Sequence, residues 1–169
     1  MTAGARRLKS TPENAEALAM DQLDATRDGE PAKRFAVVAD VMSWPVTTLS
    51  PESSIADADA IFKGCGFRHL PVADAAGRIA GVVSDRDVLR ATTPTASIGE
   101  VMTRPPITAT PHMPIRDAIR LIIFHRFNCL PVVDGAGRVC GIVTTTDLLA
   151  ALYAVMERPD AAQIMMGAR

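Results

Sequence analysis

The chain contains two copies of one segment, and this duplication constrains the fold more than any other feature. When residues 41–90 are laid on residues 101–150, twenty of the fifty positions are identical and no gap is needed. Both copies keep the triplet Leu-Pro-Val, and both keep an aspartate near the end, Asp87 and Asp147. Such a repeat predicts two similar structural units that follow one another along the chain.

Each copy predicts the element order β-α-β-β-α. In the first copy the β-prone stretch "VTTL" ends at Pro51, and "SSIADADAIFKG" then places apolar residues at helical spacing, with Gly64 or Gly66 as the stop signal. The strands "HLPVAD" and "RIAGVV" flank the turn "DAAG" and predict a hairpin. Ser84 then stands where a strand gives way to a helix, as Thr144 does in the second copy. The helix of the second copy is predicted from an apolar stripe formed by Ile115, Ala118, Ile119, Ile122 and Ile123.

The predicted fold class is therefore mixed α/β (α+β). A unit of about 50 residues buries too little surface to be stable alone, so the two copies should pack face to face. Because the copies are equivalent, we expect an approximate two-fold axis and two related clefts. The small, polar stretch "ATTPTASIGE" (91–100) is predicted to connect the halves. The predicted organisation is an N-terminal extension over 1–35, the first repeat over 36–95, the second repeat over 96–156 and a flexible tail over 157–169.

Composition narrows the classes of partner and location. The net charge is −1, from 18 basic and 19 acidic residues, which argues against nucleic acid as the main partner. No apolar segment follows the basic N-terminal residues, and runs such as "LIIF" are too short to span a bilayer, so we expect neither secretion nor membrane insertion. Three cysteines without a CxxC pair predict reduced, partly buried thiols in a cytoplasmic protein, and Cys65 with His69 makes only a weak metal pattern.

The strand-to-helix joint of each copy has two interpretations. Ser84-x-x-Asp87 and Thr144-x-x-Asp147 fit a capping box, in which a hydroxyl and an acid satisfy the start of a helix. The same geometry suits a ligand, because the unpaired N–H groups of a helix start attract phosphate. A carboxylate one turn further on can accept two hydrogen bonds from a ribose diol. The glycine three residues before each hydroxyl residue would leave the strand bare where a ligand approaches. The two roles can coexist.

Taken in order and repeated, these motifs resemble a tandem pair of cystathionine-β-synthase (CBS) domains, the Bateman module. The marks are the Val-Met starts ("DVMSWPVTTLSPESSI", "EVMTRPPITATPHMPI"), the strands "HLPVAD" and "CLPVVD", and the ends "GVVSDRD" and "GIVTTTD". The resemblance covers about residues 36–156. It implies a stand-alone, non-catalytic regulatory module that senses an adenine nucleotide (AMP, ADP or ATP), needs no cofactor and signals to an unknown effector protein by conformational change.

In this family each cleft takes its Ser/Thr-x-x-Asp motif from one repeat and its base-binding wall from the other. The first cleft would use Ser84 for phosphate and Asp87 for ribose, against a wall formed by Ile107, Asn128, Cys129 and Pro131. The second cleft would use Thr144 and Asp147, against a wall formed by Val46, Thr47, Arg68, His69 and Pro71. Arg86 is either a bidentate phosphate contact of the first cleft or a solvated surface arginine. His69 is either a ligand contact or a half-buried strand residue.

Several alternatives stay open. The module could be a structural or dimerisation scaffold with empty clefts, or a sensor of another adenosyl ligand, NAD or S-adenosylmethionine. No nucleophile–base–acid set, metal constellation or Walker-type loop supports an enzyme. Outside the duplication, residues 11–29 predict either one helix or a partly disordered tail. The resemblance further implies a homodimer built by helices, and C2 dimers are common in any case. The candidate interface residues are Ile123, Phe124, Leu148, Leu149 and Leu152.

Overall fold

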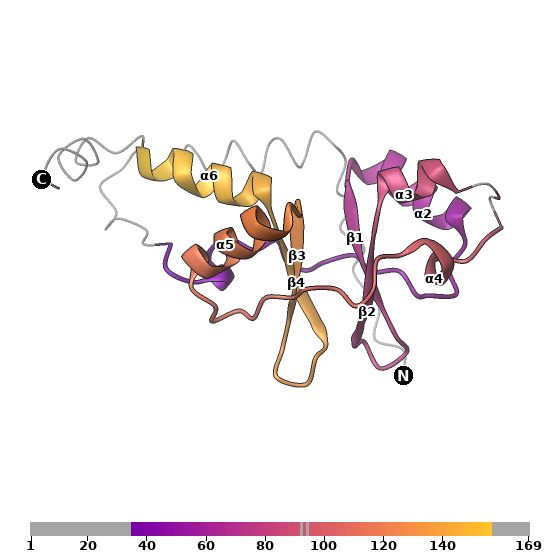
Figure 1. Cartoon of the computed structure of the whole chain (residues 1–169), viewed down its shortest axis with the longest axis horizontal. Coiled ribbons are helices and arrows are strands. Elements are labelled where there is room, and N and C mark those ends of the chain that lie inside the picture. Colours follow the sequence, from indigo (N-terminus) through magenta and orange to yellow (C-terminus); the bar gives the residue numbers. More distant parts are fainter. Residues whose placement is uncertain (1–34, 92, 94, 157–169) are drawn as a thin grey trace, which may run out of the picture.

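The computed structural model describes residues 35–91, 93 and 95–156, which include both copies. Two β-hairpins lie side by side, and helices cover the outer side of each (Figure 1). The architecture is a mixture of helices and small antiparallel sheets, which confirms the predicted fold class. The predicted N-terminal helix and the C-terminal tail lie outside the described residues.

The two copies form matching elements. The first half holds α2 (Ile55–Cys65), β1 (His69–Ala73), β2 (Ile79–Ser84) and α3 (Asp85–Arg90). The second half holds α5 (Ile115–His125), β3 (Cys129–Val133), β4 (Val139–Thr144) and α6 (Thr145–Met156). Two short helices, η1 (Val38–Asp40) and α4 (Ile98–Val101), precede the copies. The predicted first strand of each copy is reduced to a single parallel bridge, at Leu49 in one copy and at Ala109 in the other.

Local turn chemistry defines the hairpins. In the first hairpin Asp74 Oδ1 accepts hydrogen bonds from the backbone N–H groups of Ala76 and Arg78, both at 2.9 Å. Gly77 has a φ of 76°, which favours glycine because it has no side chain to clash. The resulting antiparallel register places His69 opposite Ser84. The second hairpin repeats this arrangement residue for residue.

The helices begin and end largely as the sequence predicts. Ser54 caps α2 by accepting a hydrogen bond from the backbone N–H of Asp57 at 3.1 Å. Gly66, with a φ of 68°, ends the helix, and Gly64 lies inside it. The corresponding residue of α5 is Arg126, which adopts the left-handed conformation (φ 57°) without being glycine.

Each hydrophobic core is completed by the segment that precedes the other copy. Ile98 of α4 is fully buried in the core of the first half, and its backbone N–H donates to Ser53 O at 2.8 Å. Val38 of η1 is likewise fully buried in the core of the second half. The segment 91–100, predicted as a small polar connector, thus ends in a short helix over 98–101, and Ile98 of this helix is buried in the first half.

The segments that precede each copy, and that cross to pack on the other half, also explain the glycines in β2 and β4. A Cβ atom at Gly81 would lie 2.5 Å from Met102 Sδ, and one at Gly141 would lie 2.8 Å from Met42 Sδ. The sequence interpretation that these glycines leave room for a ligand is wrong, because a methionine of the crossing segment occupies the space. The glycines are needed for the close approach of backbone to backbone.

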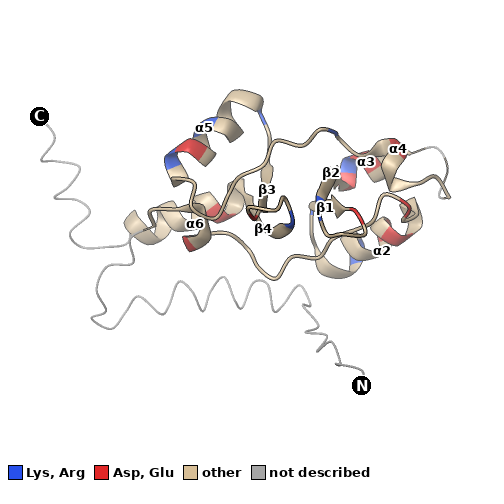
Figure 2. Ribbon diagram, turned by 90° about the horizontal axis from the view of Figure 1, so that it is seen from below, with Lys and Arg blue, Asp and Glu red and all other residues tan. Residues whose placement is uncertain are grey.

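The halves meet at their hairpin turns. The backbone N–H of Ile79 donates to Gly137 O at 3.1 Å, and the backbone N–H of Val139 donates to Gly77 O at 3.0 Å. These two hydrogen bonds are equivalent, as expected when an approximate two-fold axis relates the halves. Acidic and basic residues are interspersed over both halves in Figure 2. Within the described part of the chain, no helix combines the length and the apolar character that crossing a membrane requires.

Candidate functional site: a cavity between the repeats

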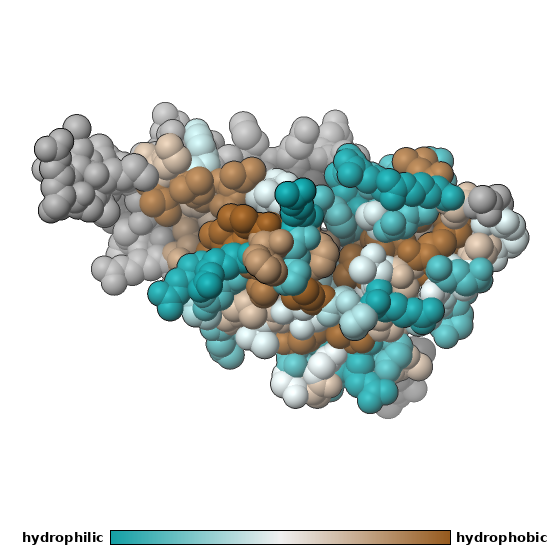
Figure 3. All heavy atoms as spheres, in the orientation of Figure 1, coloured by the Kyte–Doolittle hydropathy of each residue, from teal (hydrophilic) through white to brown (hydrophobic). Residues whose placement is uncertain are grey.

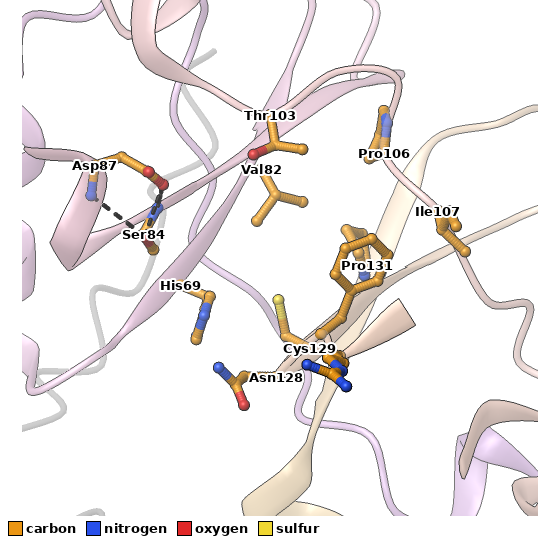
Figure 4. A pocket seen from close by; sticks show the side chains of 12 residues that line it. His69, Val82, Ser84, Asp87, Thr103, Pro106, Ile107, Asn128, Cys129 and Pro131 are labelled. Atoms are coloured by element: carbon orange, nitrogen blue, oxygen red, sulfur yellow. Dashed lines mark hydrogen bonds between the residues drawn. The ribbon is translucent and has the colours of Figure 1, made fainter. Parts of the chain in front are cut away.

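A cavity of about 220 Å³ opens between the two halves. Ser84 and Asp87 lie on one side of it, and Ile107 and Pro131 lie on the other (Figure 4). All six predicted residues of the first cleft, apart from the alternative at Arg86, therefore line one space. The complete lining is His69, Val82, Ser84, Asp87, Thr103, Pro106, Ile107, Arg126, Phe127, Asn128, Cys129 and Pro131.

The carboxylate of Asp87 caps α3 with only one of its oxygens. Oδ2 accepts hydrogen bonds from Ser84 N at 2.9 Å and from Ser84 Oγ at 2.6 Å. In return, Asp87 N donates to Ser84 Oγ at 3.3 Å, which completes a capping box. Oδ1 accepts no hydrogen bond from the described residues. The motif is therefore a helix cap that still has a carboxylate oxygen available beside the cavity.

Two N–H groups at the start of α3 are not available to bind a phosphate. Asp85 N donates to Arg68 O at 3.1 Å, and Asp87 N is used in the capping box. The expectation of unpaired N–H groups is therefore wrong at these two positions. The helix has only 6 residues, so few peptide dipoles are aligned in it. Arg86 has an exposed side chain and does not line the cavity, which matches its interpretation as a surface arginine.

The predicted second cleft differs at its carboxylate. Asp147 Oδ2 accepts hydrogen bonds from Thr144 N at 2.7 Å and from Thr144 Oγ1 at 2.6 Å, as in the first copy. Its other oxygen, Oδ1, accepts a hydrogen bond from Ser43 Oγ at 3.3 Å. Both oxygens of this carboxylate thus have protein partners, whereas among the described residues only Oδ2 of Asp87 has any.

Two residues of the predicted wall of the second cleft line other spaces. Arg68 forms an ion pair with Asp85 (Nη2–Oδ2 3.0 Å) and lines an outer groove beside Phe62 and Leu89. His69 lines the first cavity instead of the second cleft. The remaining predicted residues are the half-buried Val46, the exposed Thr47 and the fully buried Pro71.

Sequence reasoning missed six of the residues that line the first cavity, and three of these have polar side chains. His69 lies there because the hairpin register sets it opposite Ser84, and counting back from the turn could have shown this. Thr103 reaches the cavity because its segment crosses β2, where Thr103 N donates to Val82 O at 2.8 Å. Arg126 reaches it from the end of α5, where a left-handed residue other than glycine gave no sequence signal.

Burial lowers the pKa of His69 below its usual value of 6.5, although nearby Asp85 opposes the shift. The unfolded chain therefore binds a proton more readily than the folded protein does. The stability contribution of the neutral ring is complete above 6.5 and is lost as the pH falls through the lower folded pKa. We expect urea denaturation to show a smaller loss of stability between pH 7 and pH 5 in His69→Gln than in the wild type. Equal losses in the two proteins would contradict this assignment.

The thiol of Cys129 is an unreactive component of the cavity wall. Burial raises the pKa of Cys129 to about 12, so this thiol stays protonated and serves as an apolar surface. Cys65 and Cys140 are half-buried, and all three cysteines are free, as predicted. Among the residues that the structure describes, no group of three or more His, Cys, Asp or Glu side chains is arranged to hold a metal ion.

Sequence comparison identifies related chains. A family model described as the CBS domain matches residues 38–93 and 98–154. Inosine-5'-monophosphate dehydrogenase of Mycobacterium tuberculosis is 33% identical over 112 residues, which are 66% of this chain and 21% of that protein. Homoserine O-acetyltransferase of Methanococcoides burtonii is 35% identical over 112 residues, which are 66% of this chain and 23% of that protein. The chain thus spans only about a quarter or less of the length of these relatives.

Solved structures share the fold. The protein CBSX2, crystallised in complex with AMP, has a TM-score of 0.67 and 28% sequence identity; the match covers 72% of this chain and 98% of that one. The CBS domain pair of the protein MJ0100, crystallised with 5'-methylthioadenosine and S-adenosyl-L-methionine, has a TM-score of 0.67 and 30% identity. That match covers 71% of this chain and 98% of the other.

Proposed function

Because the chain belongs to the CBS-domain family, we propose that it is a regulatory module that binds an adenine nucleotide between its two repeats. The observation that carries the proposal is the cavity between the halves, where Asp87 has a carboxylate oxygen that accepts no hydrogen bond from the described residues, across from an apolar wall. Related CBS pairs hold AMP in one case and adenosyl ligands in another, which supports an adenosine-containing ligand here.

The geometry suggests how such a ligand would lie. The ribose diol would donate to Asp87 Oδ1, and the base would rest between Ile107 and Pro131 with the Cys129 thiol beside it. Ligand cavities in proteins usually measure about 300–1,000 Å³, and this one is about 220 Å³. A nucleotide would therefore bury its nucleoside and extend its charged end toward the mouth of the cavity.

We place the ligand in the first cleft in preference to the second. A diol approaching Asp147 would have to displace the Ser43 hydroxyl, whereas Asp87 Oδ1 accepts no bond from the described residues. Binding energy spent on breaking an existing hydrogen bond is lost from the affinity. Occupancy would then alter the packing of one half against the other, and an effector protein would respond to that change. The free thiols suit a cytoplasmic location, where they stay reduced.

The test of the proposed function is a thermal-shift panel of AMP, ADP, ATP, NAD and S-adenosylmethionine, with CMP as the control for non-specific binding. A ligand that binds only the folded state, present at a concentration 100 times its Kd, adds about 2.7 kcal/mol to the free energy of unfolding. We expect at least one adenosyl ligand to raise the Tm while CMP does not. A panel without any rise would favour the scaffold alternative.

We also infer that the module forms a homodimer through an apolar face on α5 and α6. Ile123 and Phe124 are 70% and 83% exposed, and Leu149 is 59% exposed. The predicted stripe of α5 is therefore only half used by the core, which buries Ala118 and Ile122. The exposed apolar side chains gather over α5 and α6 in Figure 3. A patch of this kind on a globular protein usually marks an interface.

Phe124→Asp is expected to dissociate the dimer, because it places a charge in the middle of the apolar face. The measurement is the molecular mass by sedimentation equilibrium at micromolar concentration. The control is Ala136→Asp, which adds the same charge to an exposed hairpin turn. The inference fails if the wild type sediments as a monomer, or if both variants keep the mass of the wild type.

A further inference from the structure

The cavity is lined by a cationic side chain that forms no hydrogen bond or ion pair with the residues described in the structure. Among the described residues that line it, the side chains with basic groups are His69 and Arg126. Burial lowers the pKa of His69 below 6.5, so this ring is neutral at pH 7. Arg126 then supplies the positive charge of the lining, opposite the carboxylate of Asp87 on the other half.

The backbone fixes the position of Arg126 at the end of α5. It caps α5 in the left-handed conformation, with a φ of 57°, and its N–H donates to Ile123 O at 3.4 Å. The chain then enters β3, so Arg126 lies just before the wall residues Asn128 and Cys129. A left-handed conformation is less favourable for a residue with a side chain than for glycine.

The guanidinium is free to meet a ligand. Arg78 and Arg138 form ion pairs with aspartates of their own turns, at 3.0 and 2.9 Å. Arg68 likewise pairs with Asp85. Arg126 forms no ion pair with any residue in the part of the chain that the structure describes. Its charge is therefore not committed to holding the fold together.

The first copy does not repeat this charge. The residue that corresponds to Arg126 is Gly66, which has a φ of 68° and no side chain. The corresponding end of α2 therefore leaves the second cleft without a guanidinium. The difference agrees with the Asp87 oxygen that accepts no hydrogen bond from the described residues, because a nucleotide needs both a hydrogen-bond acceptor for its ribose and a positive charge for its phosphate.

We propose that Arg126 is the anion-binding residue of the first cleft, and that it sets a preference for a nucleotide over the unphosphorylated nucleoside. The inference rests on the proposed function. The nucleoside would bury its base and its ribose, and its phosphate would reach the guanidinium at the mouth of the cavity. A guanidinium matches the oxygens of a phosphate with two parallel hydrogen bonds. At the start of α3 the N–H groups of Asp85 and Asp87 already have acceptors within the protein.

The test measures the Kd values of AMP and adenosine by calorimetry on the full-length chain. We expect the wild type to bind AMP about tenfold more tightly than adenosine at low ionic strength, and added salt to narrow the difference. Arg126→Gln should weaken the binding of AMP about tenfold and leave the Kd of adenosine within about twofold of the wild-type value. Arg126→Lys should restore part of the preference, because it keeps the charge. Arg116→Gln, at an exposed position at the start of the same helix, is the matched control and should bind both ligands as the wild type does.

The outcomes separate the two proposals. Equal affinities for AMP and adenosine in the wild type would overturn the role of Arg126 and leave the nucleoside site intact. Equal weakening of both ligands in Arg126→Gln would overturn it as well, because the residue would then be only structural. Failure of both ligands to bind the wild type would overturn the proposed adenine site itself.

Discussion

Asp87→Asn should weaken the binding of AMP by about 100-fold while the protein stays folded. The asparagine oxygen can still accept the hydrogen bonds from Ser84, but its amide group replaces the oxygen that would accept from the ribose diol. A hydrogen bond to a charged group contributes about 1.5–3 kcal/mol, and 1.4 kcal/mol corresponds to tenfold in affinity. Losing two such bonds therefore accounts for the expected effect. Calorimetric titration with AMP measures it, and the Tm of the unliganded variant checks the fold.

Asp147→Asn is the matched control for this prediction. It changes the same motif in the second copy, where Ser43 already donates to the carboxylate. We expect AMP to bind this variant within about threefold of the wild type, because substitutions at sites distant from the ligand with no shared partners have small, independent effects. A 100-fold loss in Asp147→Asn with normal binding in Asp87→Asn would place the ligand in the second cleft and contradict the assignment.

Ile98→Ala should lower the free energy of unfolding by about 2–5 kcal/mol. Ile98 stands in the segment that leads into the second repeat, yet its side chain is fully buried against Leu70, Val72 and Val83 of the first. Truncation would remove apolar contacts and leave a cavity in that core. Urea denaturation followed by circular dichroism measures the change.

Leu89→Ala is the comparison for Ile98→Ala, since Leu89 is 78% exposed on α3. Substitutions on an exposed surface usually change stability by about 0.5 kcal/mol or less. If Ile98→Ala cost no more than Leu89→Ala, residues 98–101 would be a loose connector after all. The conclusion that the segment before the second copy completes the core of the first half would then be wrong.

The parts of the fold that depend on neighbouring residues were predictable from the sequence. The hairpin turns follow from an aspartate and a glycine three residues later, as at Asp74 and Gly77. The capping boxes at Ser54 and Ser84 also involve residues only three apart. The duplication extended these local signals to both halves. The side chains of the first cleft could be predicted because the family resemblance pairs each motif with the opposite wall.

The parts that depend on distant residues could not be predicted in the same way. Thr103 pairs with Val82 only because one segment crosses to the other half, and local composition carries no signal for this. Asp147 looks equivalent to Asp87 in sequence, and only the position of Ser43 separates them. Arg126 ends a helix without glycine, so its approach to the cavity emerges from the packing of α5 against β3.

The account rests on a nucleotide lying between the repeats in the first cleft, and a crystal structure of the protein grown with AMP tests this most directly. We expect density for the base between Ile107 and Pro131, with the ribose hydroxyls within hydrogen-bonding distance of Asp87 Oδ1. A structure grown at saturating AMP in which this cavity stays empty, or in which AMP lies only against Asp147, would contradict it.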